Sequence, residues 1–395
     1  MIKQNDEMFS IHRKEHYSAS HSRLVLSGSD YFETLENLIQ SAVHTVHLQT
    51  YIFDEDETGK RIASALKDAA SRGVAVFVMI DGFGSKALSK TFVEDLKQSG
   101  VHLRFFSRFP SFQSLNLGRR LHHKVITADE NTALIGGINI AVKYHGSPEQ
   151  APWLDYAILL KGNACSDIDK ICRQIYGKKI RHKKLEHSSA IDVLEKNVFI
   201  RIRQNDRFRR KNQISRSYLS AIKNAEHSIY ITGSYFLPGP KLRKALVNAG
   251  KRGVDVNLIL AGVSDVPLFQ SATAWLYDLL FRNGIKIFEW NKSVLHGKAA
   301  LVDDRWATIG SFNLNHLSAY GSIEMNVDVL DENFAKTFKT NLKSVIETGC
   351  RQVFPISQNN HLFARLKRWA AYVLTRTSLK LIAAAPYFNP FKKFE

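Results

Sequence analysis

The chain has 395 residues, a formal net charge of +18 at pH 7 and three cysteines. This length suits two domains of ordinary size, and the positive charge favours an anionic partner, either nucleic acid or anionic lipid. Three cysteines without CxxC spacing exclude a disulfide framework and a cysteine-based zinc site, so we expect reduced thiols in a cytoplasmic setting. The first residues lack the apolar run of a signal peptide, and we expect no segment that spans a bilayer.

Helical and strand patterns alternate through the first part of the chain. Residues 59–70 have helical spacing, with Ile62, Leu66 and Ala69 on one side. Residues 74–80 form an apolar, β-rich run that predicts a strand buried on both faces. Strands that alternate with helices in this way predict an α/β sandwich.

A short motif of histidine, lysine and aspartate follows. It reads His122-x-Lys124-x4-Asp129 and continues through a predicted return strand at 132–135 into Gly-Gly-x-Asn139. Because side chains alternate between the two faces of a strand, we expect His122 and Lys124 to share one face. Glycine beside them would let the backbone approach a ligand closely.

The same motif occurs a second time. It reads His296-x-Lys298-x4-Asp303 and continues into Gly-Ser-x-Asn313, so the offset from histidine to asparagine is 17 residues in both copies (139 − 122 and 313 − 296). Paired histidines, lysines and asparagines suit attack on a phosphodiester: one histidine attacks phosphorus, the other protonates the leaving oxygen, and lysine and asparagine hold the phosphoryl oxygens. Asp129 and Asp303 each open a polar turn. Such a residue more often caps the turn or pairs with a base, and we keep both as catalytic candidates.

The whole chain is duplicated around this motif. Residues 40–53 match 223–236, and residues 71–78 match 251–258. We therefore predict two α/β/α sandwich halves that join at their histidines around one shared active site. The predicted divisions are a first half at 1–190, a second half at 191–355 and a C-terminal tail at 356–395.

The tail carries a basic amphipathic pattern. Apolar residues recur at helical spacing from Leu362 to Leu374, basic residues interrupt them, and aromatic residues continue from Tyr387 to Phe394. This pattern favours a helix that lies in a membrane interface, because the aromatics continue beyond the helix. The alternative is a helix packed on its own domain.

The doubled motif identifies the chain as a member of the phospholipase D superfamily. Within it, the chain resembles the bacterial cardiolipin synthases of the shorter B type, which lack an N-terminal membrane hairpin. Asp155 and Glu324 look like the family's acidic residues that orient the histidines. The chain departs from the family at Asn315 and Leu317, where an Asp and often an Arg stand, and at His123, where an Arg is common. The segments that carry the resemblance are 51–53, 72–74, 81–85, 119–124, 136–140 and 153–155.

The resemblance implies a two-step phosphatidyl transfer. His122 attacks the phosphatidyl phosphorus to form a phosphatidyl-histidine, His296 acts as general acid and then base, and a second alcohol displaces the enzyme. Phosphatidylglycerol as both donor and acceptor gives cardiolipin and glycerol. Lys124 and Lys298 would neutralise phosphoryl charge, Asn139 and Asn313 would bind substrate, and no metal or other cofactor is expected.

The expected partners are phosphatidylglycerol, other anionic phospholipids and the membrane surface rather than nucleic acid. The expected location is peripheral, on the cytoplasmic side of the inner membrane. Three alternatives stay open: a phospholipase D hydrolase or transphosphatidylase for another headgroup, a phosphodiesterase or nuclease, and a non-catalytic lipid-binding protein. Two intact motifs argue against the last, and the amphipathic tail argues against a nuclease. The sequence specifies no oligomeric state.

Overall fold

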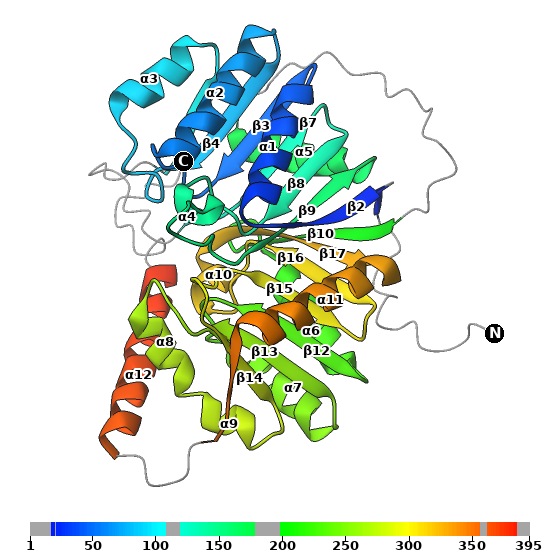
Figure 1. The fold of residues 1–395 in the computed structure, drawn as a ribbon, viewed down its shortest axis with the longest axis vertical. Coiled ribbons are helices and arrows are strands. Elements are labelled where there is room, and N and C mark those ends of the chain that lie inside the picture. The colour runs from blue at the N-terminus through cyan, green and yellow to red at the C-terminus, as the bar shows by residue number, and fades with distance from the viewer. Residues whose placement is uncertain (1–16, 20, 108–118, 178–197, 356–361, 385–395) are drawn as a thin grey trace, which may run out of the picture.

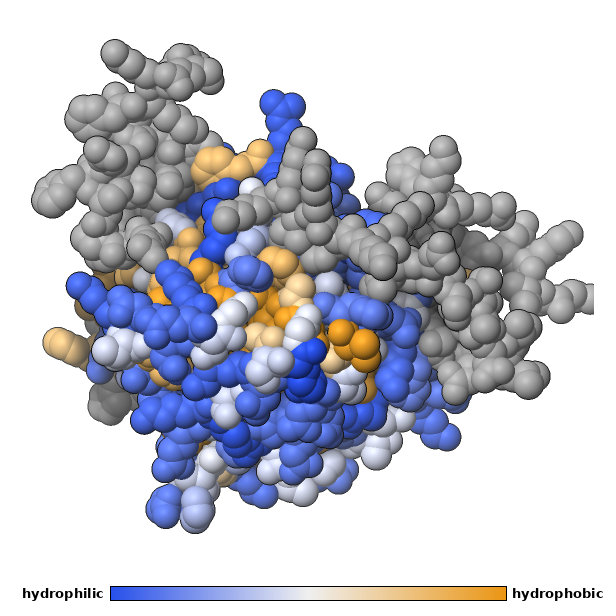
Figure 2. Space-filling model, turned by 90° about the horizontal axis from the view of Figure 1, so that it is seen from above, coloured by the Kyte–Doolittle hydropathy of each residue, from blue (hydrophilic) through white to orange (hydrophobic). Residues whose placement is uncertain are grey.

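The computed structural model describes residues 17–19, 21–107, 119–177, 198–355 and 362–384. Two α/β halves are stacked on each other, and each is built on one mixed β-sheet with helices packed against it (Figure 1). Seen from the end of the first half, the surface is mostly hydrophilic, and apolar side chains gather near its middle (Figure 2). The three cysteines, all within the described residues, form no disulfide.

The sheet of the first half has the strand order β2-β9-β8-β7-β3-β4-β5. The strands β3, β4 and β5 run parallel, because helices connect them, whereas a tight hairpin joins the antiparallel pair β7 and β8. The strands are β2 (His21–Leu26), β3 (Thr45–Thr50), β4 (Ala75–Asp81), β5 (His102–Phe106), β7 (Val125–Ala128), β8 (Thr132–Gly136) and β9 (Tyr156–Lys161). The helices are α1 (Ser29–Ser41), α2 (Glu57–Ser71), α3 (Lys90–Gln98), α4 (Val142–His145) and α5 (Ala164–Tyr176).

The sheet of the second half has the order β1-β10-β17-β16-β15-β12-β13-β14-β18, and two short strands, β11 and β6, pair with β10 and β17. The strands are β1 (Tyr17–Ala19), β6 (Arg120–Leu121), β10 (Val198–Asp206), β11 (Lys211–Asn212), β12 (Ser228–Gly233), β13 (Asp255–Ala261), β14 (Lys286–Trp290), β15 (Lys298–Val302), β16 (Trp306–Gly310), β17 (Ser322–Leu330) and β18 (Cys350–Val353). The helices are α6 (Gln213–Asn224), α7 (Pro240–Lys251), α8 (Pro267–Ala274), α9 (Tyr277–Phe281), α10 (His316–Tyr320), α11 (Glu332–Gly349) and α12 (Leu362–Ala384).

The two sheets confirm the predicted duplication. The order β2-β9-β8-β7-β3-β4-β5 in the first half corresponds strand by strand to β10-β17-β16-β15-β12-β13-β14 in the second. The predicted helix at 59–70 is α2, which begins after Asp56, whose carboxylate caps the amide of Gly59. The predicted buried strand at 74–80 is β4, and six of its seven residues are buried.

The halves share a core and exchange short segments. One hydrophobic cluster joins Ile158 of β9 to Leu301 of β15 and Val327 of β17. The strand β6 of the first half pairs with β17, and β1 pairs with β10, so residues 17–19 belong to the second sheet although the sequence places them in the first half. The predicted division at residue 190 lies outside the described residues.

The tail helix α12 packs against α8 and α10 at the edge of the second half (Figure 1). Within the described part of the chain, no helix combines the length and the apolar character needed to cross a membrane. The aromatic segment predicted at 387–394 lies outside the described residues. The alternative of a helix packed on its own domain therefore holds for one side of α12.

Candidate active site

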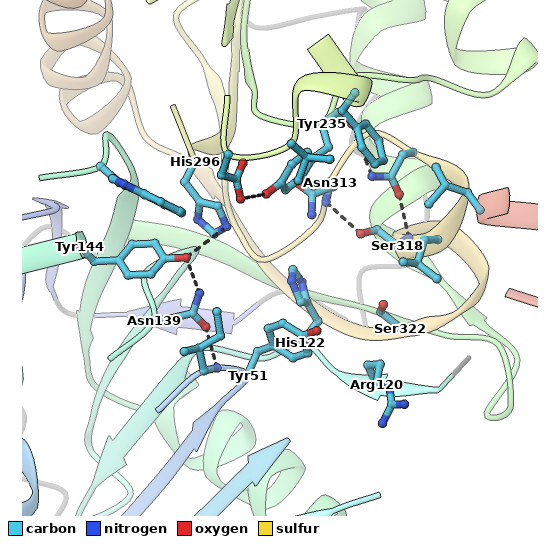
Figure 3. A pocket seen from close by; sticks show the side chains of 18 of the residues that line it. Tyr51, Arg120, His122, Asn139, Tyr144, Tyr235, His296, Asn313, Ser318 and Ser322 are labelled. Atoms are coloured by element: carbon cyan, nitrogen blue, oxygen red, sulfur yellow. Dashed lines mark hydrogen bonds between the residues drawn. The ribbon is translucent and has the colours of Figure 1, made fainter. Parts of the chain in front are cut away.

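A cavity of about 300 Å³ lies where the two halves meet, and both motif histidines line it (Figure 3). Polar and aromatic side chains form most of the wall around the histidines. They are Tyr51, Arg120, Asn139, Lys143, Tyr144, Trp153, Tyr235, Asp265, Asn313, Asn315, Ser318 and Ser322.

Each histidine precedes a strand and is held by the opposite half. His122 and His296 lie in extended segments just before β7 and β15, and not within these strands as the alternation argument predicts. The amide of His122 donates to the carbonyl of Ile323, and the amide of His296 donates to the carbonyl of Leu154. Each of these partners directly precedes an acidic residue, so the backbone contact between the halves delivers a carboxylate to each ring.

Glu324 holds the first histidine. Its Oε2 lies 2.9 Å from Nδ1 of His122 and also accepts a hydrogen bond from the hydroxyl of Ser311. Because the carboxylate accepts the Nδ1 proton, Nε2 of the neutral ring carries the lone pair. Burial lowers the pKa of His122, and Glu324 opposes this shift. The geometry therefore suits a nucleophile at Nε2.

Asp155 holds the second histidine. Its Oδ2 lies 2.6 Å from Nδ1 of His296, and Nε2 of the ring lies 3.4 Å from the hydroxyl of Tyr144. Burial is the largest cause that lowers the pKa of His296, and Lys298 adds to it. Burial raises the pKa of Asp155 to about 7, although Lys298 opposes the rise. His296 therefore sits in a different electrostatic setting from His122, despite the duplicated motif.

Both lysines are buried beside the histidines. Lys124 donates to the carbonyl of His122 at 2.9 Å, and its ammonium lies 5.2 Å from the centre of the Tyr51 ring. Lys298 lies 2.9 Å from Nδ1 of His296 and 3.9 Å from Asp155. Burial lowers the pKa of Lys124 to about 7 and that of Lys298 to about 8. An anionic ligand would favour the charged form of both groups.

The two predicted asparagines line the cavity. Asn139 accepts from the amide of Ile52 and donates to the hydroxyl of Tyr144 at 2.7 Å. Asn313 accepts a hydrogen bond from the hydroxyl of Ser234 at 3.0 Å. Both amide groups are therefore fixed in orientation, which suits a group that positions phosphoryl oxygens.

The motif aspartates lie at turns outside the cavity, which contradicts the prediction that they are catalytic. Asp129 accepts hydrogen bonds from the amides of residues 43–45, and Asp303 accepts from the amides of residues 226–228. Both have a positive φ, as have Glu130 and Asp304 after them, which is typical of a type I′ hairpin turn. Asp129 and Asp303 fix the turns and do not line the cavity.

The motif glycines leave space for the acidic residues and their neighbours. A Cβ added at Gly137 would lie 2.4 Å from Oδ1 of Asp155, and one at Gly310 would lie 2.3 Å from the carbonyl of Met325. Glycine at 137 is therefore needed so that the carboxylate of Asp155 can approach the motif. We expected these glycines to let the backbone approach a ligand. Instead they let the residues that orient the histidines lie close to the motif.

Several cavity residues were not predicted from the sequence. Tyr51 lies near the end of the duplicated segment 40–53 and Tyr235 near the end of its counterpart 223–236, one position apart in the alignment (51 − 40 = 11 and 235 − 223 = 12), so the repeat itself carried a signal. Tyr144 follows Asn139 by five residues and Ser318 follows Asn313 by five, and each contacts that asparagine. A comparison of the two copies beyond the motif would have identified both.

The three positions that depart from the family pattern differ in where their side chains lie. Asn315 and Leu317 line the cavity. His123 is buried on the other side of the segment, with Nδ1 3.1 Å from Oε1 of Gln49, so it does not face the cavity. Among the described residues, no group of three or more His, Cys, Asp or Glu side chains is placed to hold a metal ion.

Comparisons with known proteins agree with this geometry. The family described as "Cardiolipin synthase, PLD-like domain" matches residues 35–148 and 218–346. The chain is 35% identical to cardiolipin synthase B of Escherichia coli over 84% of this chain and 81% of that protein. It is 30% identical to the minor cardiolipin synthase ClsB of Bacillus subtilis over 79% of this chain and 77% of that protein. The crystal structure of phosphatidylserine synthase from Haemophilus influenzae matches with a TM-score of 0.72 at 14% identity, covering 94% of this chain and 97% of that one, which shows a shared fold. The chain therefore belongs to the cardiolipin synthase family of the phospholipase D superfamily.

Proposed function

We propose that this phosphatidyltransferase makes cardiolipin from two molecules of phosphatidylglycerol and releases glycerol. The observation that carries the proposal is the pair of buried imidazoles in one cavity, each held at Nδ1 by a carboxylate of the opposite half. This arrangement leaves Nε2 of each ring for a phosphodiester. Relatives named cardiolipin synthase, similar over most of their length, support the choice of lipid.

In the first step, Nε2 of His122 attacks phosphorus, and the bond from phosphorus to the glycerol oxygen breaks. His296 gives its Nε2 proton to that oxygen, so glycerol leaves as a neutral alcohol. Burial disfavours the protonated form of His296, but the phosphate of the bound lipid brings a negative charge that favours it. The product of this step is a phosphatidyl group on His122.

In the second step, the roles reverse at the same centre. The glycerol hydroxyl of a second phosphatidylglycerol gives its proton to Nε2 of His296 and attacks phosphorus. The bond from phosphorus to His122 breaks, and cardiolipin leaves. Lys124 and Lys298, both beside the rings, would neutralise the charge that develops on the phosphoryl oxygens. Both histidines return to their starting states, so the cycle needs no further reactant.

The assignment of the nucleophile rests on the difference between the two rings. Nε2 of His296 faces the hydroxyl of Tyr144, and Lys298 lies beside its Nδ1. The side chain of His122 is 14% exposed, compared with 7% for His296, which leaves more room for a lipid to approach it. These contacts support His122 as the nucleophile and His296 as the proton carrier.

The outer face of α12 would hold the enzyme at an anionic membrane. Large apolar side chains on this helix are exposed beside basic ones, a combination that suits the interface of an anionic leaflet. The exposed apolar side chains are Phe363, Leu366, Trp369, Val373, Leu374, Leu381 and Ile382. We place this contact on the cytoplasmic side of the inner membrane, as a peripheral attachment.

Mass spectrometry of the lipid products tests the reaction. Phosphatidylglycerol vesicles mixed with the protein should yield cardiolipin and one glycerol per transfer. Phosphatidic acid as the sole product would identify water as the acceptor and a hydrolase instead. Cleavage of an oligonucleotide without any lipid product would identify a nuclease.

Trapping the covalent intermediate tests the two histidines. The His296→Ala variant should accumulate a slow phosphatidyl adduct on His122, because the leaving alcohol and the incoming alcohol both lose their proton carrier. The His122→Ala variant should form no adduct. An adduct on His296 in that variant would reverse the assignment.

A further inference from the structure

The helices α8 and α12 are antiparallel neighbours that meet at the active-site cavity. At one end of the pair, the guanidinium of Arg365 lies 6.0 Å from the centre of the Trp275 ring. At the other end, Phe269 and Leu379 both line the cavity. The start of α8 and the last turns of α12 therefore lie together at the wall of the active site. Figure 1 shows the red helix α12 beside α8.

The side of α12 that packs on the protein carries small side chains, apart from one leucine. The buried side chains are those of Ala371, Thr375, Leu379 and Ala383, spaced every four residues. Alanine and threonine let the helix lie close to its neighbours, as ridge-and-groove packing of helices requires. Leu379 is the only large apolar side chain among these four, and it is the one that reaches the cavity.

An apolar side of the cavity is formed by α12 and by α8 and α10, on which it packs; Ile52, from the first half, is the other aliphatic residue of the lining. Val266 and Phe269 come from the start of α8, Leu317 comes from α10, and Leu379 comes from α12. The histidines and asparagines come instead from the segments around β7, β8, β15 and β16. A phosphodiester with two small polar alcohols would leave this apolar side in contact with water, which is unfavourable.

The apolar side continues to the molecular surface. Val266 and Leu268, at the start of α8, are exposed, and so are Leu381 and Ile382, two and three residues beyond Leu379 on α12. Lys380, between Leu379 and Leu381, is exposed as well. Exposed apolar side chains with a basic residue among them suit contact with an anionic lipid surface.

We propose that α8, α10 and α12 form the path by which the acyl chains of the donor phospholipid reach the active site. Val266, Leu268, Leu381 and Ile382 form the rim that enters the lipid surface, and Phe269, Leu317 and Leu379 hold the first part of the acyl chains beside the histidines. This inference rests on the proposed phosphatidyl transfer and assigns the donor's orientation within that site. A bound chain also removes water from the apolar side, which favours an alcohol acceptor over hydrolysis.

Chain-length dependence tests this path. Two substrates are compared: phosphatidylglycerol with eighteen-carbon chains in detergent micelles, and phosphatidylglycerol with four-carbon chains as a monomer. Detergent removes the bilayer, so α12 binding to a membrane does not limit the rate. Leu379→Trp should block the path and lower kcat/KM for the long-chain lipid by about tenfold or more, a discrimination that hydrophobic pockets reach with one methylene. Turnover of the short-chain lipid should fall less, because its four-carbon chains fill only the first part of the path, so the ratio of long-chain to short-chain kcat/KM should drop.

Two further variants keep the test decisive. Leu317→Asn places a polar group in the same path at a half-buried position, and it answers the question if Leu379→Trp does not fold. Leu276→Ala is the matched control, because Leu276 is buried in the same hydrophobic cluster and does not line the cavity. It should lower the melting temperature and leave the ratio of long-chain to short-chain turnover unchanged.

The outcomes separate this inference from the proposed function. Equal loss of both substrates in Leu379→Trp and Leu317→Asn, or no loss of either, overturns the acyl path and leaves the phosphatidyl transfer standing. A wild-type enzyme that turns over neither lipid refutes the transfer itself and the path with it. A changed ratio in Leu276→Ala also overturns the path, because it would assign the effect to general loosening of the second half.

Discussion

Replacement of Glu324 by glutamine should isolate the role of charge at the first histidine. Glu324 is fully buried, and its Oε2 accepts from both Nδ1 of His122 and the hydroxyl of Ser311. The amide of Met325 in turn donates to the oxygen of Ser311, so the Ser311 proton points to Glu324. In the Glu324→Gln variant, the amide oxygen will therefore occupy the place of Oε2. The tautomer of His122 stays the same, and only the negative charge is lost.

The size of the effect follows from that charge. A hydrogen bond to a charged group is worth about 1.5–3 kcal/mol, compared with about 1 kcal/mol for a neutral one. The positive ring of a phosphatidyl-His122 needs the charge most, so the loss falls mainly on formation of the intermediate. The difference is about 0.5–2 kcal/mol. At about 1.4 kcal/mol for each factor of ten, we expect Glu324→Gln to slow the chemical step by about 2- to 30-fold.

The assay is single-turnover formation of a labelled phosphatidyl adduct, followed together with the melting temperature. Ser311→Ala is the control, since it removes the neighbouring hydroxyl and keeps the carboxylate, and it should slow the step much less. A Glu324→Gln enzyme that forms the adduct at the wild-type rate, with an unchanged melting temperature, would contradict this role of the charge. A large effect of Ser311→Ala alone would mean that position rather than charge matters.

Three further predictions concern the lysines, the turns and the tail. The pKa of Lys124 is lowered to about 7, so this lysine is charged mainly below that pH. We therefore expect kcat/KM of the free enzyme to fall as the pH rises from 6 to 9, and Lys124→Arg should remove the first part of that fall. A flat profile in the wild type would contradict this. Asp303 accepts hydrogen bonds from three backbone amides, so Asp303→Ala should lower the free energy of unfolding in urea by about 1–3 kcal/mol. The kcat of the folded enzyme should stay within about threefold. A loss of kcat without a loss of stability would show that Asp303 acts in catalysis. The double variant Lys367→Ala, Lys380→Ala removes two exposed charges of α12. At about 1 kcal/mol for each charge, its binding to phosphatidylglycerol vesicles in a flotation assay should weaken by about 30-fold at low salt and much less at high salt. Equal flotation of both proteins would show that α12 does not bind the membrane.

The repeat was readable from the sequence because it depends on local pattern. Apolar runs predicted β4 and α2, and the matched spacing of His122 and His296 predicted paired chemistry at a phosphodiester. The Asp residues at 129 and 303 were also recognisable as turn residues, since an aspartate that follows an apolar run most often caps a turn. These features need only neighbours in the chain, and periodicity and turn chemistry record such neighbours directly.

The pairing of each acid with its histidine depends on contacts between the two halves. Asp155 is 141 residues from His296, and Glu324 is 202 residues from His122. Resemblance marked both acids as residues that orient histidines, but it did not say that each acts across the two halves. That pairing follows from the backbone contacts of Ile323 and Leu154 with the histidine segments, and no sequence pattern encodes such a contact between segments.

The sequence pattern of the tail also did not show which side of α12 packs on the protein. Its large apolar residues predict a buried or membrane-facing side, yet the side that packs on the protein carries Ala371, Thr375, Leu379 and Ala383. Small side chains pack here because they let α12 approach α8 closely, whereas the larger ones remain exposed. The spacing of its apolar and basic residues was enough to predict a basic amphipathic helix. Only the packing of α12 on its neighbours decided that one of its leucines, Leu379, forms a wall of the active site, because that depends on where a distant part of the chain leaves space for it.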